Sequence, residues 1–121
     1  MIQIKLKRVY EELSETDGYR VLVDRLWPRG MKKEHLKMDE WAKGLTPSAD
    51  LRTWFHVDMA ERWEGFEAMY RKELEASDVA KEFITRIKNY QAVTLLYASK
   101  DPVYNHACIL KAFLDEQLGK C

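Results

Sequence analysis

Two groups of charged and polar side chains in this sequence could bind or transform an anion. The first follows an apolar run and consists of Asp24, Arg25 and Arg29. Two guanidinium groups beside a turn can clamp a phosphate or carboxylate, while Asp24 could orient one of them or act as a base. The same residues could instead form an internal Asp–Arg ion pair that shapes the turn. Trp27, within this turn, is a candidate for lining a pocket.

The second group follows another apolar run, residues 92–98. Its members are Tyr97, Ser99, Lys100, Asp101, Asn105 and His106. A strand, a short polar loop and a helix N-terminus together form a natural anion site, to which Lys100 would add charge. Tyr97 or His106 could act with Asp24 in catalysis. Asp101 could instead cap the helix and His106 could serve packing, and no glycine-rich phosphate loop accompanies the turn.

A third group is spaced by four residues and consists of Ser48, Arg52 and His56. On a helix these side chains would share one face, and a serine beside a histidine invites a hydrolase interpretation. However, Ser48 follows Pro47 in the manner of a helix N-cap, and no nucleophile elbow surrounds it. We therefore carry Ser48 and Arg52 forward as candidate ligand-binding residues.

Three apolar patterns predict the strands that would position these groups. Residues 2–7 alternate apolar and polar side chains, which is typical of a strand with one buried face. Residues 19–24 and 92–98 are almost continuous apolar runs, which predict strands buried on both faces. Residues 36–41 show a shorter alternation that could form another strand.

Helices are predicted between and after these strands. Ser48 would cap a helix that begins at Ala49, and Ser77 or Asp78 would cap a later one. Residues 58–76 carry apolar side chains at helical spacing, and a last helix would begin at Asp101 and Pro102. The residues expected to face inward are Met59, Trp63, Phe66, Tyr70, Leu74, Val79, Phe83, Ile84, Ile87, Val103, Ala107, Leu110, Leu114 and Leu118.

This order of elements predicts one α/β domain over residues 1–121, with three layers (α/β/α) around a small, mostly parallel sheet. We expect residues 21–24 and 93–98 to be adjacent or near-adjacent parallel strands. Their carboxyl ends would then lie on the same side of the sheet, where ligands bind in such folds. The first two polar groups would meet there.

Composition narrows the function classes. The 121 residues carry 20 Lys and Arg against 20 Asp and Glu, and this balance argues against nucleic acid or an anionic membrane as a partner. Positive charge is nevertheless in local excess over residues 20–37. Two cysteines without zinc-ligand spacing, and no signal-peptide or membrane-spanning pattern, predict a cytoplasmic protein without a metal site. The sequence names no cofactor, and it leaves the oligomeric state open.

The run Arg20-Val21-Leu22-Val23-Asp24-Arg25-Leu26-Trp27-Pro28-Arg29-Gly30 resembles the signature of the YeaO-like family, domain of unknown function family 488. The resemblance extends over essentially the whole chain. Further matching segments are Trp41-Ala42-Lys43, Pro47-Ser48, Leu51-Arg52 with Trp54-Phe55-His56, Tyr70 with Glu73-Leu74, Thr94 to Asp101, and Asn105-His106-Ala107. Ser99 stands where we expect alanine. The resemblance implies a small cytoplasmic bacterial or archaeal α/β protein and brings no established activity.

Two function classes follow. One is an enzyme or binder that acts on a small anionic ligand, nucleotide-like or phosphate-like, at the ends of two buried strands. The other is a non-catalytic regulatory or nucleic-acid-related module that uses the basic face of residues 20–37. A pocket that joins Asp24, Arg29, Lys100 and Asn105 would favour the first class, and a flat basic surface would favour the second.

Overall fold

A four-stranded parallel sheet organises the computed structural model, which describes residues 2–101 and 103–119. The strands are β1 (Gln3–Arg8), β2 (Tyr19–Leu22), β3 (Glu40–Trp41) and β4 (Ala92–Tyr97), in the order β1-β4-β2-β3. Every pair is parallel, and β2 lies beside β4 with Val21 opposite Leu95. The predicted adjacency and common direction of these two apolar strands are confirmed, as is the α/β class.

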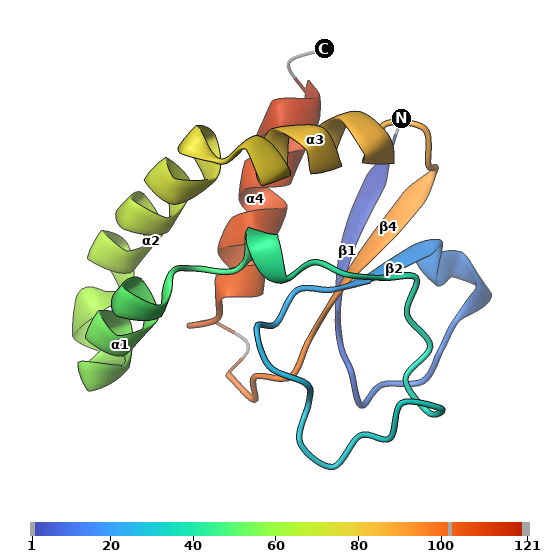
Figure 1. The fold of residues 1–121 in the computed structure, drawn as a ribbon, viewed down its shortest axis with the longest axis horizontal. Helices are drawn as coiled ribbons and strands as arrows, with labels where there is room; N and C mark the ends of the chain where they lie inside the picture. Colours follow the sequence, from blue (N-terminus) through green and yellow to red (C-terminus); the bar gives the residue numbers. More distant parts are fainter. Residues whose placement is uncertain (1, 102, 120–121) are drawn as a thin grey trace.

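Helices cover one face of the sheet. They are α1 (Ala49–Val57), α2 (Met59–Ala76), α3 (Asp78–Ile87) and α4 (His106–Gly119). Figure 1 shows α4 running beside the strands, with α1 and α2 packed as a pair and α3 crossing the end of the bundle. The main core joins these helices to alternate residues of the strands, including Ile4, Val21, Val93 and Leu95. Their burial follows from the strand period of two.

Irregular chain, rather than a helix, covers the other face of the sheet. Leu22 and Leu96 point to this side, where they form a smaller core with Val9 and Leu36. The covering segment runs from residue 24 to residue 39, and its Trp27 ring meets the Trp41 ring edge to face at 5.4 Å. Residues 36–41 predict a longer strand than the structure contains, because β3 has only two residues.

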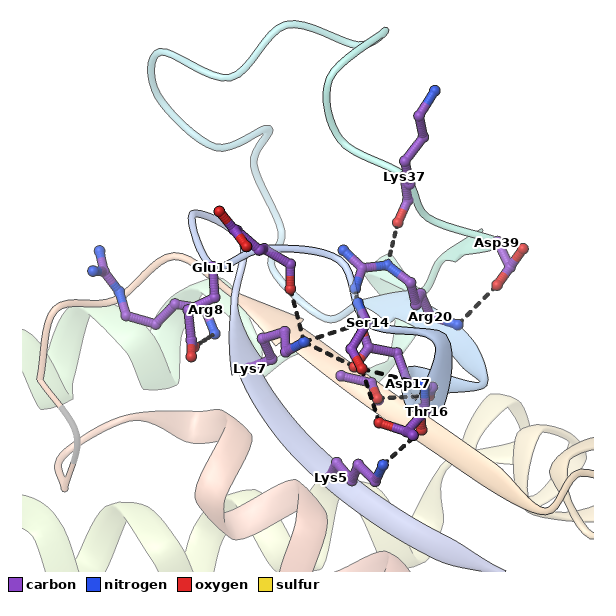
Figure 2. A network of polar contacts seen from close by, with 12 residues as sticks. Lys5, Lys7, Arg8, Glu11, Ser14, Thr16, Asp17, Arg20, Lys37 and Asp39 are labelled. Carbon is purple, nitrogen blue, oxygen red and sulfur yellow. Dashed lines mark hydrogen bonds and ion pairs between the residues drawn. The ribbon is translucent and has the colours of Figure 1, made fainter.

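A polar network occupies the remainder of this second face (Figure 2). Asp17, which is 2% exposed, follows β1 in a short 3-10 helix (Glu15–Asp17). Its carboxylate accepts hydrogen bonds from Lys7 Nζ at 2.8 Å, from the backbone N–H of Ser14 at 3.0 Å and from Arg20. Arg20 also donates to the carbonyl of Lys37, so the network ties β1 and β2 to the covering segment.

Local capping sets the helix starts. The Ser48 hydroxyl accepts from the backbone N–H of Leu51, and that of Ser77 accepts from Ala80 N–H, which confirms both predicted caps. The prediction for the last helix was wrong. Helix α4 begins at His106, and the Asn105 side chain accepts from Cys108 N–H at 3.0 Å in the manner of an N-cap.

Two side chains expected in the core are exposed instead. Val103 precedes α4 and is 57% exposed, while Val79 is 50% exposed because Ala80 takes the inward position on α3. Pro102, expected at the first position of the last helix, lies outside the described residues. No helix in the described part of the chain combines the length and hydropathy needed to cross a membrane.

Candidate functional site

A cavity of about 290 Å³ opens at the carboxyl ends of β2 and β4. The chain after β2, the loop after β4, and helices α1, α2 and α4 all contribute to its walls. Most of the residues proposed from the sequence line it: Asp24, Arg25, Trp27, Arg29, Arg52, Asn105 and His106. The placement follows from the parallel sheet, because parallel strands deliver their carboxyl-terminal turns to one edge.

Asp24 and His106 are neighbours in this cavity, and the backbone holds both. Oδ2 of Asp24 accepts a hydrogen bond from Ala98 N–H at 2.8 Å, which joins the turns after the two strands. His106 Nε2 lies 2.6 Å from the Val23 carbonyl oxygen and 3.5 Å from Asp24 Oδ1. A carbonyl only accepts, so Nε2 carries the hydrogen and donates it. His106 thereby ties the start of α4 to the end of β2.

Burial favours the uncharged forms of this pair. Desolvation raises the pKa of Asp24 above its ordinary value, although His106 and the Ala98 N–H partly oppose the rise. Desolvation likewise lowers the pKa of His106, against the opposing effects of the Val23 carbonyl and Asp24. Arg52 and His56 lower it further through like charge. The imidazole is therefore held toward its neutral form.

Arg52 brings a cationic group into the cavity from α1. Its Nε is buried, and no group in residues 2–101 and 103–119 accepts a hydrogen bond from it. Buried donors in folded proteins are nearly always paired, so this nitrogen is exceptional. Arg25 and Arg29 also line the cavity and are exposed. Three arginines thus line a space whose described acidic lining residue is Asp24.

Aromatic and aliphatic side chains form much of the rest of the wall. Phe55 and Phe66 lie stacked, with ring centroids 4.0 Å apart and planes 11° apart. Met59, Tyr104 and Trp27 add half-buried surface around them. Trp27 is fixed by its indole N–H, which donates to the Met31 carbonyl at 2.5 Å. The cavity therefore combines guanidinium donors with an apolar lining.

Comparison with known proteins identifies the family of this chain. The model of a family described as "Inactive DUF488-N3 subclade" matches residues 3–120. The chain belongs to this family. It is 42% identical over 113 residues to "Uncharacterized protein YeaO" of Escherichia coli (strain K12), covering 93% of this chain and 97% of the relative. It is 34% identical to "Uncharacterized protein Rv3073c" of Mycobacterium tuberculosis (strain ATCC 25618 / H37Rv), covering 93% and 94%. No solved structure gives a significant match.

Four residues proposed for the site of this DUF488 protein lie outside the cavity lining. They are Ser48, Tyr97, Lys100 and Asp101. Ser48 caps α1 and donates its hydroxyl hydrogen to Glu73 at 2.6 Å. Tyr97 packs against the main core, and burial raises its pKa. Lys100 is exposed beside the cavity loop.

Asp101 is engaged in its own turn. Its Oδ1 accepts hydrogen bonds from Val103 N–H and Tyr104 N–H, each at 2.9 Å, and these bonds lower the pKa of the carboxyl group. The predicted capping role is thus met in a turn before α4 rather than at the helix. These two amides, which the sequence suggests as anion donors, are therefore already satisfied.

Sequence patterns did not assign Phe55, Phe66, Met59 and Tyr104 to the site. Their residue types are typical of a core, and Phe55 and Phe66 are indeed almost fully buried. A signal was present in the spacing of α1, where Arg52, Phe55 and His56 fall on one helical face. Among the described residues, no group of three or more His, Cys, Asp or Glu side chains is placed to hold a metal ion.

Proposed function

We propose that this protein binds a small anionic ligand in the cavity at the ends of β2 and β4 and does not transform it. The observation that carries the proposal is the buried Nε of Arg52, which lacks an acceptor among the described residues. Leaving a buried donor unpaired costs about 1–3 kcal/mol, and a bound anion would remove that cost. A guanidinium group is also the side chain best matched to carboxylates and phosphates.

The electrostatic setting supports an anion. Arg25 and Arg29 reach the same cavity as Arg52, and His56 lines it from the next turn of α1. Burial raises the pKa of Asp24, which reduces the negative charge that this carboxyl group would present to an incoming anion. The excess of positive side chains around this cavity favours entry of negative charge.

Binding without chemistry agrees with how the acid–base pair is held. His106 already donates from Nε2 to the Val23 carbonyl, and Asp24 accepts from Ala98 N–H. Both side chains therefore serve to join the two strand ends and the start of α4. The description of the family as an inactive subclade supports the same choice.

The test is a titration followed by two-dimensional NMR. Benzoate, inorganic phosphate and sulfate are added separately to the parent protein, to Arg52→Gln, and to Lys100→Gln as a matched loss of one exposed charge. We expect saturable shifts at the amides of residues 24–27, 29 and 98–99 for at least one anion. These shifts weaken in Arg52→Gln and persist in Lys100→Gln. No saturable shift with any anion, or equal shifts in Arg52→Gln and the parent, would contradict the proposal.

A second candidate is the regulatory or nucleic-acid-related module that uses residues 20–37. Its support is the exposure of Arg25, Arg29 and Lys33 on the segment that covers the second face. Arg20 is withdrawn from that surface, because it is 5% exposed and bonded to Asp17. Electrophoretic mobility of a labelled oligonucleotide at low and high salt tests this candidate, since phosphate contacts give a steep loss of affinity with salt.

A further inference from the structure

The lining of the cavity restricts which anion it can accept. Proteins that bind phosphate groups usually present several free backbone N–H groups, at a helix N-terminus or in a nest. Here three amides near the polar rim already have partners. Asp24 accepts from Ala98 N–H, and Asp101 accepts from Val103 and Tyr104 N–H.

An amide in the first turn of α4 is also already hydrogen-bonded within the protein. The Asn105 side chain accepts from Cys108 N–H at 3.0 Å, and Asn105 is itself 3% exposed. At α1, the Leu51 N–H is taken by the Ser48 hydroxyl. Neither helix therefore offers these cap amides to a phosphate. Among the described side chains, the buried donor without a hydrogen-bond partner is the Arg52 Nε.

The apolar wall stands directly beside that donor. Arg52 and Phe55 are three residues apart on α1, so their side chains project from the same face. Phe66 is stacked on Phe55 and both are almost fully buried, so the apolar surface that a ligand can touch comes from the half-buried Met59, Trp27 and Tyr104. An anion bonded to Arg52 must therefore place the remainder of its structure against aromatic and aliphatic surface. A ligand made only of charge and oxygen would leave that surface uncovered.

The size of the cavity adds a limit. Its volume of about 290 Å³ lies just below the roughly 300–1,000 Å³ that small-molecule sites occupy, so the ligand must be small. We propose that the ligand is a compact monocarboxylate with a flat apolar body, such as an aromatic acid, bound through its carboxylate to the Arg52 guanidinium group and with its ring against the half-buried Met59, Trp27 and Tyr104 that line the cavity. This inference rests on the proposed function and narrows it to one head group and one kind of body.

Four probes separate the features of such a ligand: benzoate, acetate, benzamide and phenyl phosphate. Each is titrated calorimetrically into the parent protein at one pH and one ionic strength. Acetate should bind on the order of tenfold more weakly than benzoate, because it lacks the ring. Benzamide should bind more weakly than benzoate because it carries no charge. Phenyl phosphate should also bind more weakly, because the amides of Ala98, Val103, Tyr104 and Cys108 are already hydrogen-bonded within the protein.

Failure of this inference differs from failure of the proposed function. Phenyl phosphate binding as tightly as benzoate would overturn the carboxylate head group while leaving anion binding intact. Acetate binding as tightly as benzoate would overturn the apolar body. If none of the anions binds, the proposed function fails and this inference falls with it.

An Arg52→Gln variant gives an internal control. Its affinity for benzoate should fall on the order of tenfold, whereas its affinity for benzamide should hardly change. A general loss of structure would reduce both affinities together. Equal loss for the two probes, with the fold intact by circular dichroism, would show that Arg52 does not read the carboxylate and would overturn the inference. The comparison among the probes on the parent protein requires no substitution and cannot be confused with misfolding.

Discussion

In the proposed function, Arg52 is the residue whose role in binding would come at a cost to stability. Its Nε is buried without an acceptor among the described residues, which is an arrangement that folding alone does not favour. A group kept in that condition stores a cost that a ligand can remove. The consequence should be visible in the stability of the protein without ligand.

We therefore expect Arg52→Met to raise the free energy of unfolding by about 1 kcal/mol. Methionine keeps a long flexible side chain and a similar helix propensity, while the unpaired donor disappears. Urea unfolding with an unchanged m-value measures the effect. Lys100→Met, at an exposed position, is the control and should change the midpoint little. A lower midpoint for Arg52→Met would mean that the guanidinium group stabilises the fold.

The pair of Asp24 and His106 gives a titration prediction. Burial lowers the pKa of His106 in the folded protein below its ordinary 6.5. At a pH between this lowered pKa and 6.5, the unfolded chain therefore binds more protons than the folded chain. This contribution makes stability fall as the pH drops through that window. In the Asp24→Asn variant the favourable negative charge is gone, so the pKa of His106 should fall further.

The measurement is an NMR titration of the His106 ring protons in both proteins. A midpoint above the ordinary 6.5 in the parent would contradict the expected effect of burial. A midpoint that stays the same in Asp24→Asn would show that the 3.5 Å separation from Asp24 Oδ1 carries no electrostatic coupling.

Sequence reasoning reached the cavity through residues that follow the strands directly. Asp24 and Arg29 come from one turn, and Asn105 and His106 come from the segment after the other, so the parallel sheet alone brings them together. Sequence reasoning failed where a side chain forms hydrogen bonds with its own neighbours in the chain. Asp101 accepts hydrogen bonds from the amides two and three residues ahead of it. This local turn competes with capping of the helix, and the residue type alone does not show which of the two an aspartate adopts.

At the scale of the elements, periodicity identified every long strand and helix. The two serine caps fixed the starts of α1 and α3. The start of α4 was missed because Asp101 and Asn105 can both cap, and tertiary contacts decide between them. His106, the first residue of α4, is anchored to the Val23 carbonyl, which places the helix start beside β2. The irregular layer over the second face had no periodic signal to reveal it.

Gly18 sets the entry into β2. Its φ is +68°, and a Cβ at this position would lie 2.2 Å from the Ala92 carbonyl oxygen at the start of β4. We expect Gly18→Ala to lower the free energy of unfolding by at least about 2 kcal/mol, through positive φ and contact with backbone together.

Gly30→Ala is the matched control. Gly30 has a φ of +78°, yet a Cβ added there would meet no atom within 4 Å, so the cost is that of the backbone conformation alone. Thermal unfolding of the two variants separates the effects. Equal losses would show that the close approach of Gly18 to β4 is relaxed at little cost.

For the whole molecule, the Asp17 network is a polar link between the sheet and the irregular segment that covers its second face. Desolvation opposes ionisation of Asp17, but hydrogen bonds from Lys7 and Ser14 N–H and the charge of Lys7 outweigh it, so the pKa of Asp17 lies below its ordinary value. A carboxylate with a depressed pKa stabilises the fold above its unfolded pKa, and this contribution is lost as the pH falls through the folded pKa.

We expect Asp17→Asn to destabilise the protein by about 3 kcal/mol near neutral pH, because it leaves the buried Arg20 without its carboxylate. The difference between variant and parent should shrink in acid. Denaturation at several pH values measures both effects. Asp115→Asn, which removes the exposed ion pair with Lys111, should change stability by no more than about 1 kcal/mol. A pH-independent loss for Asp17→Asn would contradict the role of its charge.

The strand order also governs how the protein is made. Strand β4 lies between β1 and β2, yet it is the last strand to leave the ribosome. At roughly 5–20 residues per second, β1 must wait on the order of 5–20 s for its partner. During synthesis the apolar sides of β1 and β2 have no sheet to join, so a nascent chain that ends before residue 92 should be held by chaperones or degraded. We therefore expect the four-stranded sheet to form only after β4 has been synthesised, because β1 and β2 both pair with β4 and not with each other.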